Sequence, residues 1–529
     1  MYDLIVRGGQ VLDGRGGEPR LTDVAVSGDR IAVVGDLPAD EPAVTTLSAD
    51  GLVVCPGFVN PLSHSYFSVL QDGTSLGELV QGVTTQIFGE GDSMGPVPPG
   101  DRETLAREAA TYGVDVTWTR LSEYLDTVER AGCTQNVASL VGAATMRILG
   151  VGYDDRPATD AELDTMRGVL EEEMADGALG IGSSLIYAPG SYAGTEELVA
   201  LCEVAGRYGG TYASHVRHEG SDLLPATDEL LDIVRRTGVH GEHWHLKAAG
   251  EPEWPLMDQA LAKLQAARDE GLPVCADVYP YTWSGTGLSS NIPPHWHEGG
   301  PDALFDRLND PGTRARIRAE MVTIGRYGDT PHAEDVLLLR LRHPDNARWQ
   351  GHTLAEIAAD RGQDPVDTAL DILASERTSV FTAFHSMSED NLRRQLAVPW
   401  VGVCSDAGSI SPDGPGADTP THPRAYGSFA RVLGHYTREL GVLTLPDAVR
   451  KMTSLPASTF GLTDRGVLEP GYAADLVVLD PDTVADLATF AEPHQLSVGV
   501  RDVVVNGVPA LRDGSPTGER PGRRLRRSR

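Results

Sequence analysis

Two short segments carry the clearest signal for the fold: Tyr212-Ala213-Ser214-His215 and Glu242-His243-Trp244-His245-Leu246. Each is rich in apolar and aromatic residues, as buried β-strands are, and each contains histidine at or near its end. Residues 223–237, which lie between them, show the apolar spacing of an amphipathic helix. The sequence therefore predicts two neighbouring parallel strands joined by a helix.

The same alternation extends in both directions along the chain. Further apolar runs of strand length occupy residues 83–88, 136–141, 178–182, 274–278 and 401–404, and helical patterns occupy residues 160–176, 195–208 and 254–270. Repetition of strand and helix over about 400 residues predicts an α/β protein whose parallel strands close into a (β/α)8 TIM-like barrel. A doubly wound sheet is the alternative, but no G-x-G-x-x-G motif follows an early strand.

The two ends of the chain have a different texture. Short apolar runs with glycine and asparagine turns occupy residues 1–55 and again residues 464–515, so both ends are expected to build one small β-sandwich. The barrel is expected to span residues 56–463. Residues 285–343, rich in proline, glycine and tryptophan, predict a lid inserted at the barrel mouth. Six arginines lie between residues 520 and 529, and residues 516–529 are expected to form a solvated, mobile basic tail.

Composition excludes several classes of protein. The chain has 529 residues, with 44 lysines and arginines against 76 aspartates and glutamates, which gives a formal net charge of −32. Such a surface repels nucleic acid. No apolar run approaches the ~20 residues that cross a bilayer, and no signal-peptide pattern opens the chain. We therefore expect a cytoplasmic protein that acts on a small molecule and binds neither nucleic acid nor membrane, while no oligomeric state follows from the pattern.

Polar residues follow five of the apolar runs. In a barrel these positions converge on the mouth formed by the carboxyl ends of the strands. Imidazoles and carboxylates without thiolates suit Zn²⁺ or a similar divalent ion. The candidate donors are His64, Glu90, His215, His245 and Asp406.

Each donor taken alone also has a structural interpretation. His64 could be a hydrogen-bonded loop residue, while Glu90 and Asp406 could cap helices. His215 and its neighbour Glu219 could belong to a polar surface cluster. These interpretations suit one residue more easily than five at the ends of successive strands.

Longer motifs resemble the amidohydrolase superfamily, and within it the N-acyl-D-amino-acid deacylase (D-aminoacylase) family. They include PGFVNPLSHS (56–65), GVTTQIFGEG (82–91), YASHVRHEG (212–220), HWHLKAAGEPEW (243–254), CSDAG (404–408), THPRAYGSFARVL (421–433) and ADLVVLDP (474–481). The resemblance implies a (β/α)8 barrel with a sandwich from both chain ends. It also implies that His215 and His245 hold zinc and that Asp406 acts as general base, with no metal role for His243.

Two departures from the family pattern affect the metal site. The His-x-His expected after the first strand reads Leu62-Ser63-His64, so one ligand of a second metal is missing. The cysteine expected after the second strand is replaced by Gly89-Glu90-Gly91-Asp92, where Glu90 is the nearest substitute and Asp92 the alternative. We therefore expect one tightly bound zinc ion. His64 is expected either to join Asp406 at a weak second site or to donate to the oxyanion of the transition state.

The resemblance also implies which residues bind substrate. Lys247, Tyr279 and Arg424 match the residues that contact the substrate carboxylate, and the serine of that region is either Ser284 or displaced by Gly285. The leading hypothesis is zinc-dependent hydrolysis of an N-acyl-D-amino acid. The alternatives are a cyclic amidase related to dihydroorotases and hydantoinases, and a degenerate barrel without catalysis. The lysine that cyclic amidases carry at the end of strand 4 is absent from residues 178–184.

Overall fold

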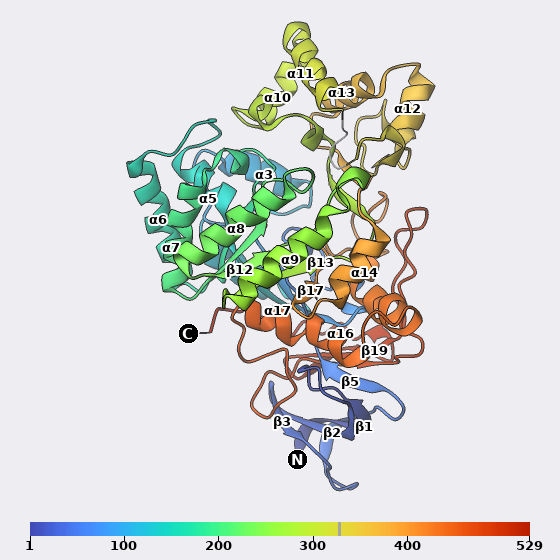
Figure 1. Ribbon diagram of the computed structural model, residues 1–529. Helices are drawn as coiled ribbons and strands as arrows, with labels where there is room; N and C mark the ends of the chain where they lie inside the picture. Colours follow the sequence, from blue (N-terminus) through green and yellow to red (C-terminus); the bar gives the residue numbers. More distant parts are fainter. Residues whose placement is uncertain (326–329, 529) are drawn as a thin grey trace.

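A computed structural model of the chain describes residues 1–325 and 330–528. It consists of a sheet domain, a barrel and a lid, arranged one above the other in Figure 1. The sheet domain carries the N-terminus at the bottom of the view, and the lid helices lie at the top. Residues 326–329 of the predicted lid and Arg529 of the predicted tail lie outside the described residues.

Parallel strands form the barrel in the order in which they occur along the chain. Almost all of their residues are buried, and neighbouring strands are hydrogen-bonded to one another. The strands are β6 (Phe58–Asn60), β7 (Val83–Phe88), β8 (Asn136–Ser139) continued by β9 (Val141–Gly142), β10 (Gly180–Ser184), β11 (Thr211–His215), β12 (His240–His243), β13 (Val274–Val278) and β17 (Val401–Val403).

The last strand closes the barrel against the first. His64 donates its backbone N–H to Ala407 O at 3.0 Å, and Asp406 donates its own to Leu62 O at 3.0 Å. The β8 and β9 segments act as one barrel strand, because Leu140, which lies between them, donates its backbone N–H to Phe88 O of β7 at 2.9 Å. With β8 and β9 counted as one strand, the described residues form eight barrel strands, and the predicted (β/α)8 barrel is confirmed.

Helices on the outside of the barrel connect its strands or follow the last of them. They bury one apolar face against the barrel, as an amphipathic helix of an α/β protein does. They are α1 (Ser68–Gln71), α2 (Leu76–Leu79), α3 (Arg102–Ala110), α4 (Leu121–Ala131), α5 (Ala143–Gly150), α6 (Asp160–Ala175), α7 (Thr195–Arg207), α8 (Leu223–Thr237), α9 (Leu256–Asp269), α14 (Glu389–Ala397), α15 (Arg424–Arg431), α16 (Leu445–Met452) and α17 (Ser454–Thr459). None of the helices in the described part of the chain is both long and apolar enough to cross a bilayer.

Both chain ends contribute to one nine-stranded sheet. Its order is β21-β20-β19-β18-β5-β1-β2-β3, with β4 on β1, and the antiparallel pair β5–β18 joins the N-terminal strands to the C-terminal ones. This agrees with the predicted sandwich from both ends. The strands are β1 (Tyr2–Val11), β2 (Arg20–Ser27), β3 (Arg30–Val34), β4 (Ala43–Ser48), β5 (Val53–Pro56), β18 (Leu476–Leu479), β19 (Val500–Val505), β20 (Val508–Arg512) and β21 (Ser515–Pro516).

The lid is larger than the sequence predicts. Its antiparallel sheet pairs β14 with β16 and β16 with β15, and one apolar core runs from Leu288 to Phe384. The predicted end at residue 343 is therefore too early, because helices beyond it complete the core. The elements are β14 (Trp283–Gly287), α10 (Pro301–Asn309), α11 (Pro311–Ile324), β15 (Val336–Leu338), α12 (Leu354–Arg361), α13 (Pro365–Glu376) and β16 (Phe381–His385).

Residues 516–520 are exposed, but most of residues 521–528 are at least partly buried, so the prediction of a solvated, mobile tail is wrong for this part of the segment. Val137 of β8 donates its N–H to Arg523 O at 2.9 Å, and Leu525 is buried. The side chain of Arg524 is 6% exposed and forms an ion pair with Asp126 at 2.7 Å. Arg523 pairs with Asp29 of the sheet domain, and the backbone of the segment hydrogen-bonds to the barrel, so residues 521–528 pack against the protein.

Gly182 of β10 tests the packing inside the barrel. A Cβ there would lie 2.0 Å from Gly89 O and 2.7 Å from the ring of the fully buried Trp244. We expect Gly182→Ala to reduce the free energy of unfolding by about 1–3 kcal/mol through overpacking. Gly168→Ala in the middle of α6, where a Cβ meets nothing within 4 Å, is the control and should stabilise by about 0.5–1 kcal/mol. Thermal unfolding midpoints measure both, and equal midpoints would contradict the packing described.

Candidate active site

The five predicted donors all line one cavity of about 880 Å³ at the carboxyl ends of the strands. His64 follows β6, Glu90 follows β7, and His215 is the last residue of β11. His245 lies two residues beyond β12, and Asp406 lies three residues beyond β17. The barrel therefore brings together side chains that are far apart in the sequence.

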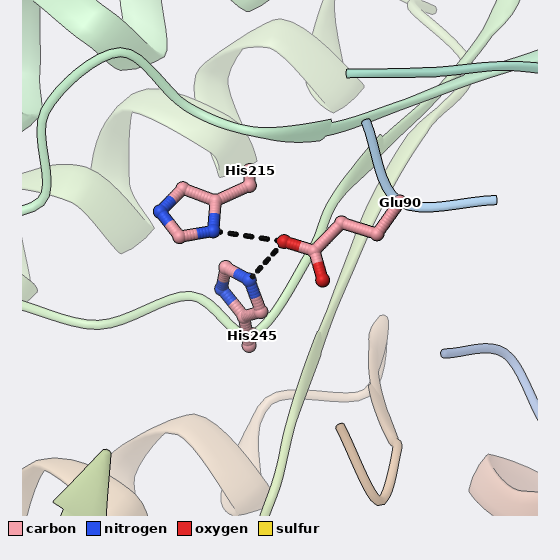
Figure 2. Close-up of side chains that lie close together, drawn as sticks. All are labelled: Glu90, His215 and His245. Carbon is pink, nitrogen blue, oxygen red and sulfur yellow. Dashed lines mark hydrogen bonds and ion pairs between the residues drawn. The ribbon is translucent and has the colours of Figure 1, made fainter. Parts of the chain in front are cut away.

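Glu90 lies between the two histidines that follow the central strands (Figure 2). Its Oε1 is 2.9 Å from His215 Nδ1 and 3.2 Å from His245 Nε2. Gly89 and Gly91, on either side, have φ of +107° and +67°, a conformation that favours glycine. The Gly-Glu-Gly turn thus places the Glu90 carboxylate in the centre of the cavity.

A second group of donors shares the same carboxylate. His64 Nε2 lies 3.1 Å from Glu90 Oε2 and 3.0 Å from Asp406 Oδ1. Within each group, Glu90–His215–His245 and His64–Glu90–Asp406, the ligand atoms lie within 4.8 Å of one another. Leu62 is fully buried in the apolar core and adds no donor to the second group.

The pKa values of two of the histidines are raised, which indicates that the site stabilises positive charge. Burial disfavours the charged form of His64, but hydrogen bonds to Asp406 and Glu90 outweigh it and raise its pKa to about 9. Burial and the nearby Lys247 disfavour the charged form of His245, but Glu219 and Glu90 favour it more strongly and raise the pKa of His245 to about 10. The carboxylates therefore hold protons on the imidazoles. A divalent ion fits the same nitrogen and oxygen donors and would displace those protons.

The backbone at two donors is held in an uncommon conformation. His245 has φ of +35° and Asp406 has φ of +49°, in the left-handed region that side chains other than glycine rarely adopt. Asp277, in β13, accepts the backbone N–H of His245 at 2.6 Å. This contact stabilises the turn that points the His245 ring into the cavity.

Glu219 contacts both histidines, although the sequence offered only a polar surface cluster for it. The residue is 5% exposed, and its oxygens lie 3.1 Å from His245 Nδ1 and 3.4 Å from His215 Nε2. A carboxylate behind a ligating histidine fixes the orientation of the ring. Its position four residues after the strand-end His215 was the available signal.

The residues predicted to bind substrate also line the cavity. Lys247 Nζ lies 2.6 Å from Glu219, and Arg424 Nη1 lies 2.7 Å from Asp406 Oδ2. The Arg424 guanidinium stacks 4.6 Å from the centre of the Tyr279 ring and donates to Gly285 O at 3.1 Å. Its Nε is buried without a hydrogen-bond partner among the described residues.

Two other residues of the sequence motifs lie outside the donor groups. Asp92 lines the cavity but belongs to neither group of ligand atoms. His243 is fully buried, and its Nδ1 lies 3.3 Å from Trp244 O. Burial lowers the pKa of His243 to about 4, so the ring is neutral. Of the two carboxylates in the Gly89–Asp92 turn, Glu90 is the one that meets the histidines.

A barrel with imidazole and carboxylate donors at the carboxyl ends of its strands has the architecture of metal-dependent barrel hydrolases. Over residues 45–510 the chain matches the amidohydrolase family. It is 34% identical to D-aminoacylase of Alcaligenes xylosoxydans xylosoxydans over 100% of the chain and 98% of that protein. It is 36% identical to N-acyl-D-glutamate deacylase of the same organism, over 99% and 96%.

The fold is also similar to that of a deacylase of known structure. N-acyl-D-glutamate deacylase from Bordetella bronchiseptica, complexed with zinc and a phosphonate mimic of the tetrahedral intermediate, has a TM-score of 0.83. The match is 33% identical in sequence and covers 99% of both chains. The chain belongs to the amidohydrolase family, and within it to the N-acyl-D-amino-acid deacylases.

Glu219 generates a prediction about metal affinity. Because its carboxylate orients His215 and His245, Glu219→Gln should weaken zinc binding by about 10–100-fold. Glu197→Gln is the matched control, since Glu197 is 6% exposed and pairs with Arg147 at 2.6 Å outside the donor groups. Titration against a chromophoric chelator measures both affinities. An unchanged affinity in Glu219→Gln would show that the carboxylate does not support the ligands.

Proposed function

We propose that the protein hydrolyses the amide bond of N-acyl-D-amino acids, releasing a carboxylic acid and a D-amino acid, with zinc held by Glu90, His215 and His245. The observation that carries the proposal is the convergence of these three donors from three strands on one point of the cavity. The names of the full-length relatives support the D-configured substrate. A bound zinc ion would supply a water of lowered pKa and a polarised carbonyl.

Asp406 is the proposed general base. Burial disfavours its charge, but Arg424 and His64 outweigh that cost and keep the pKa of Asp406 below its usual range. The carboxylate is therefore ionised at neutral pH. It takes the proton of the attacking water and passes it to the leaving nitrogen.

Lys247, Tyr279 and Arg424 are proposed to bind the substrate carboxylate. The unpartnered Nε of Arg424 supports this role, since a buried guanidinium donor without an acceptor is costly. Lys247 and Arg424 are each held in place by a carboxylate, Glu219 and Asp406. Arginine binds carboxylates in a planar, bidentate fashion, which fixes the orientation of the substrate.

His64, Glu90 and Asp406 are proposed as a weaker second set. With Leu62 in the core, this set offers a single imidazole, whereas the first set offers two. We infer that the first set holds one ion tightly. His64 then either holds a second ion weakly with Asp406 or donates to the oxyanion.

The site supports the deacylase over the other two candidates. The barrel strand β10 ends in Ser183 and Ser184, and Lys247 is the one lysine among the described residues that line the cavity. The site therefore lacks the strand-4 lysine expected of a cyclic amidase. A degenerate barrel is disfavoured because the first donor set is complete.

A panel of N-acetyl-D- and N-acetyl-L-amino acids tests the reaction. We expect the zinc-loaded protein to hydrolyse D-substrates and to lose activity on chelation, with recovery when zinc is restored. His245→Ala should be inactive and metal-poor because it removes a donor of the tight set. Inactivity on every D-substrate together with opening of a cyclic imide or ureide would contradict the proposal.

Asp406→Asn separates catalysis from metal binding. Turnover should fall by about 10²–10⁴-fold, because the amide cannot accept the proton. The bound zinc should remain, since Asp406 lies outside the tight set. Asp418→Asn, at another carboxylate lining the cavity, is the control and should keep turnover. Loss of most bound zinc in Asp406→Asn would mean that Asp406 is mainly a metal ligand.

A further inference from the structure

The lid places two arginines in the wall of the active-site cavity. Arg340 and Arg342 follow the lid strand β15, and both line the cavity. Neither forms an ion pair with any residue of the described ranges 1–325 and 330–528. Arg340 is partly buried, and its Nε is buried without a hydrogen-bond partner.

These arginines differ from the cations on the barrel side of the same cavity. Lys247 is paired with Glu219 and Arg424 with Asp406, at 2.6 and 2.7 Å. Asp92 and Asp418 also line the cavity, yet neither pairs with the lid arginines within the described structure. Arg342 has carboxylates nearby, since it interacts electrostatically with Glu108 and its backbone N–H donates to Glu376 Oε2 at 2.8 Å. The Arg340 guanidinium therefore offers the positive charge that no carboxylate of the described residues pairs with.

The lid sheet fixes Arg340 relative to the proposed binding site of the first carboxylate. The backbone N–H of Arg340 donates to Phe381 O in β16 at 3.2 Å, and β16 pairs with β14. Gly285 of β14 in turn accepts a hydrogen bond from Arg424. Gly285 pairs with Ala383, two residues along β16 from Phe381. Two strand spacings across the sheet and two residues along it, roughly 12 Å in all, thus separate the backbones of Arg340 and Gly285. The arginine side chain can shorten that gap, so a substrate held at Arg424 can present a second group to Arg340.

A partly buried guanidinium with an unpaired donor binds anions, and it binds carboxylates best because of its planar fork. We propose that Arg340, with Arg342 beside it, binds a second carboxylate of the substrate, so that the preferred substrate is a dianion. The second carboxylate belongs either to the amino-acid side chain or to the acyl group. This inference rests on the proposed deacylase function.

Three substrates distinguish the sources of the second charge. N-acetyl-D-leucine carries one carboxylate, N-acetyl-D-glutamate carries the second on the side chain, and N-succinyl-D-leucine carries it on the acyl group. We expect kcat/KM of the wild-type protein to be about tenfold or more higher for one of the two dianions than for N-acetyl-D-leucine. The better dianion identifies the group that meets Arg340.

Variants test the role of the lid arginines. Arg340→Met should reduce the ratio of kcat/KM between that dianion and N-acetyl-D-leucine by about tenfold, mainly through KM. Arg342→Met should reduce it less, because Arg342 is more exposed. Arg316→Met is the control, since Arg316 is exposed on α11, hydrogen-bonds Thr313 and does not line the cavity. Its ratio should equal that of the wild-type protein.

The outcomes separate this inference from the function on which it rests. Hydrolysis of N-acetyl-D-leucine by Arg340→Met shows that the variant is folded, so the ratio can be interpreted. If the ratio is the same as in the wild-type protein, or if the wild-type protein prefers the monoanion, the second carboxylate site is wrong and the deacylase function stands. If none of the three substrates is hydrolysed by the zinc-loaded wild-type protein, the deacylase function itself is wrong.

Discussion

The carboxylate of Glu90 lies within 3.2 Å of three imidazoles, those of His64, His215 and His245. Glu90 belongs to both groups of ligand atoms, so the arrangement of the cavity depends on this side chain. Its position follows from the barrel, because β7 ends at Phe88 and the Gly89–Gly91 turn directs Glu90 over the strand ends. A carboxylate here makes a harder ligand than the thiolate expected from the family pattern.

The surrounding residues keep concentrated charge stable inside a protein of net charge −32. Burying charge is costly unless each group is paired. Glu219 pairs with Lys247 and supports the histidines, and Asp406 pairs with Arg424. The residues proposed to bind substrate and those proposed to bind metal are thereby in contact, because Lys247 and Arg424 are each held by a carboxylate that also contacts a histidine of the site. The lid completes the cavity with cations of its own.

The barrel and the gathering of its strand-end donors could be predicted from sequence, because the alternation of apolar runs and helices defines where side chains converge. The sequence favoured Glu90 and left Asp92 as the alternative, because which carboxylate meets the histidines depends on the direction of the turn at Gly91. Glu219 was placed only in a polar surface cluster, because its position four residues after His215 is visible in the sequence but its burial follows from the packing of the loop after β11. The basic composition of the C-terminus predicted a solvated tail, but Arg523 and Arg524 form ion pairs with carboxylates that are distant in the sequence. The lid boundary failed because α12 and α13 pack on residues before 343.

Anomalous diffraction at the zinc absorption edge, from crystals of the zinc-loaded protein, tests the central claim directly. The account predicts a strong peak about 2.0–2.2 Å from a Glu90 oxygen and from the nitrogens of His215 and His245. Any second peak, beside His64 and Asp406, should be weaker. A principal peak that Glu90 does not ligate would contradict the account.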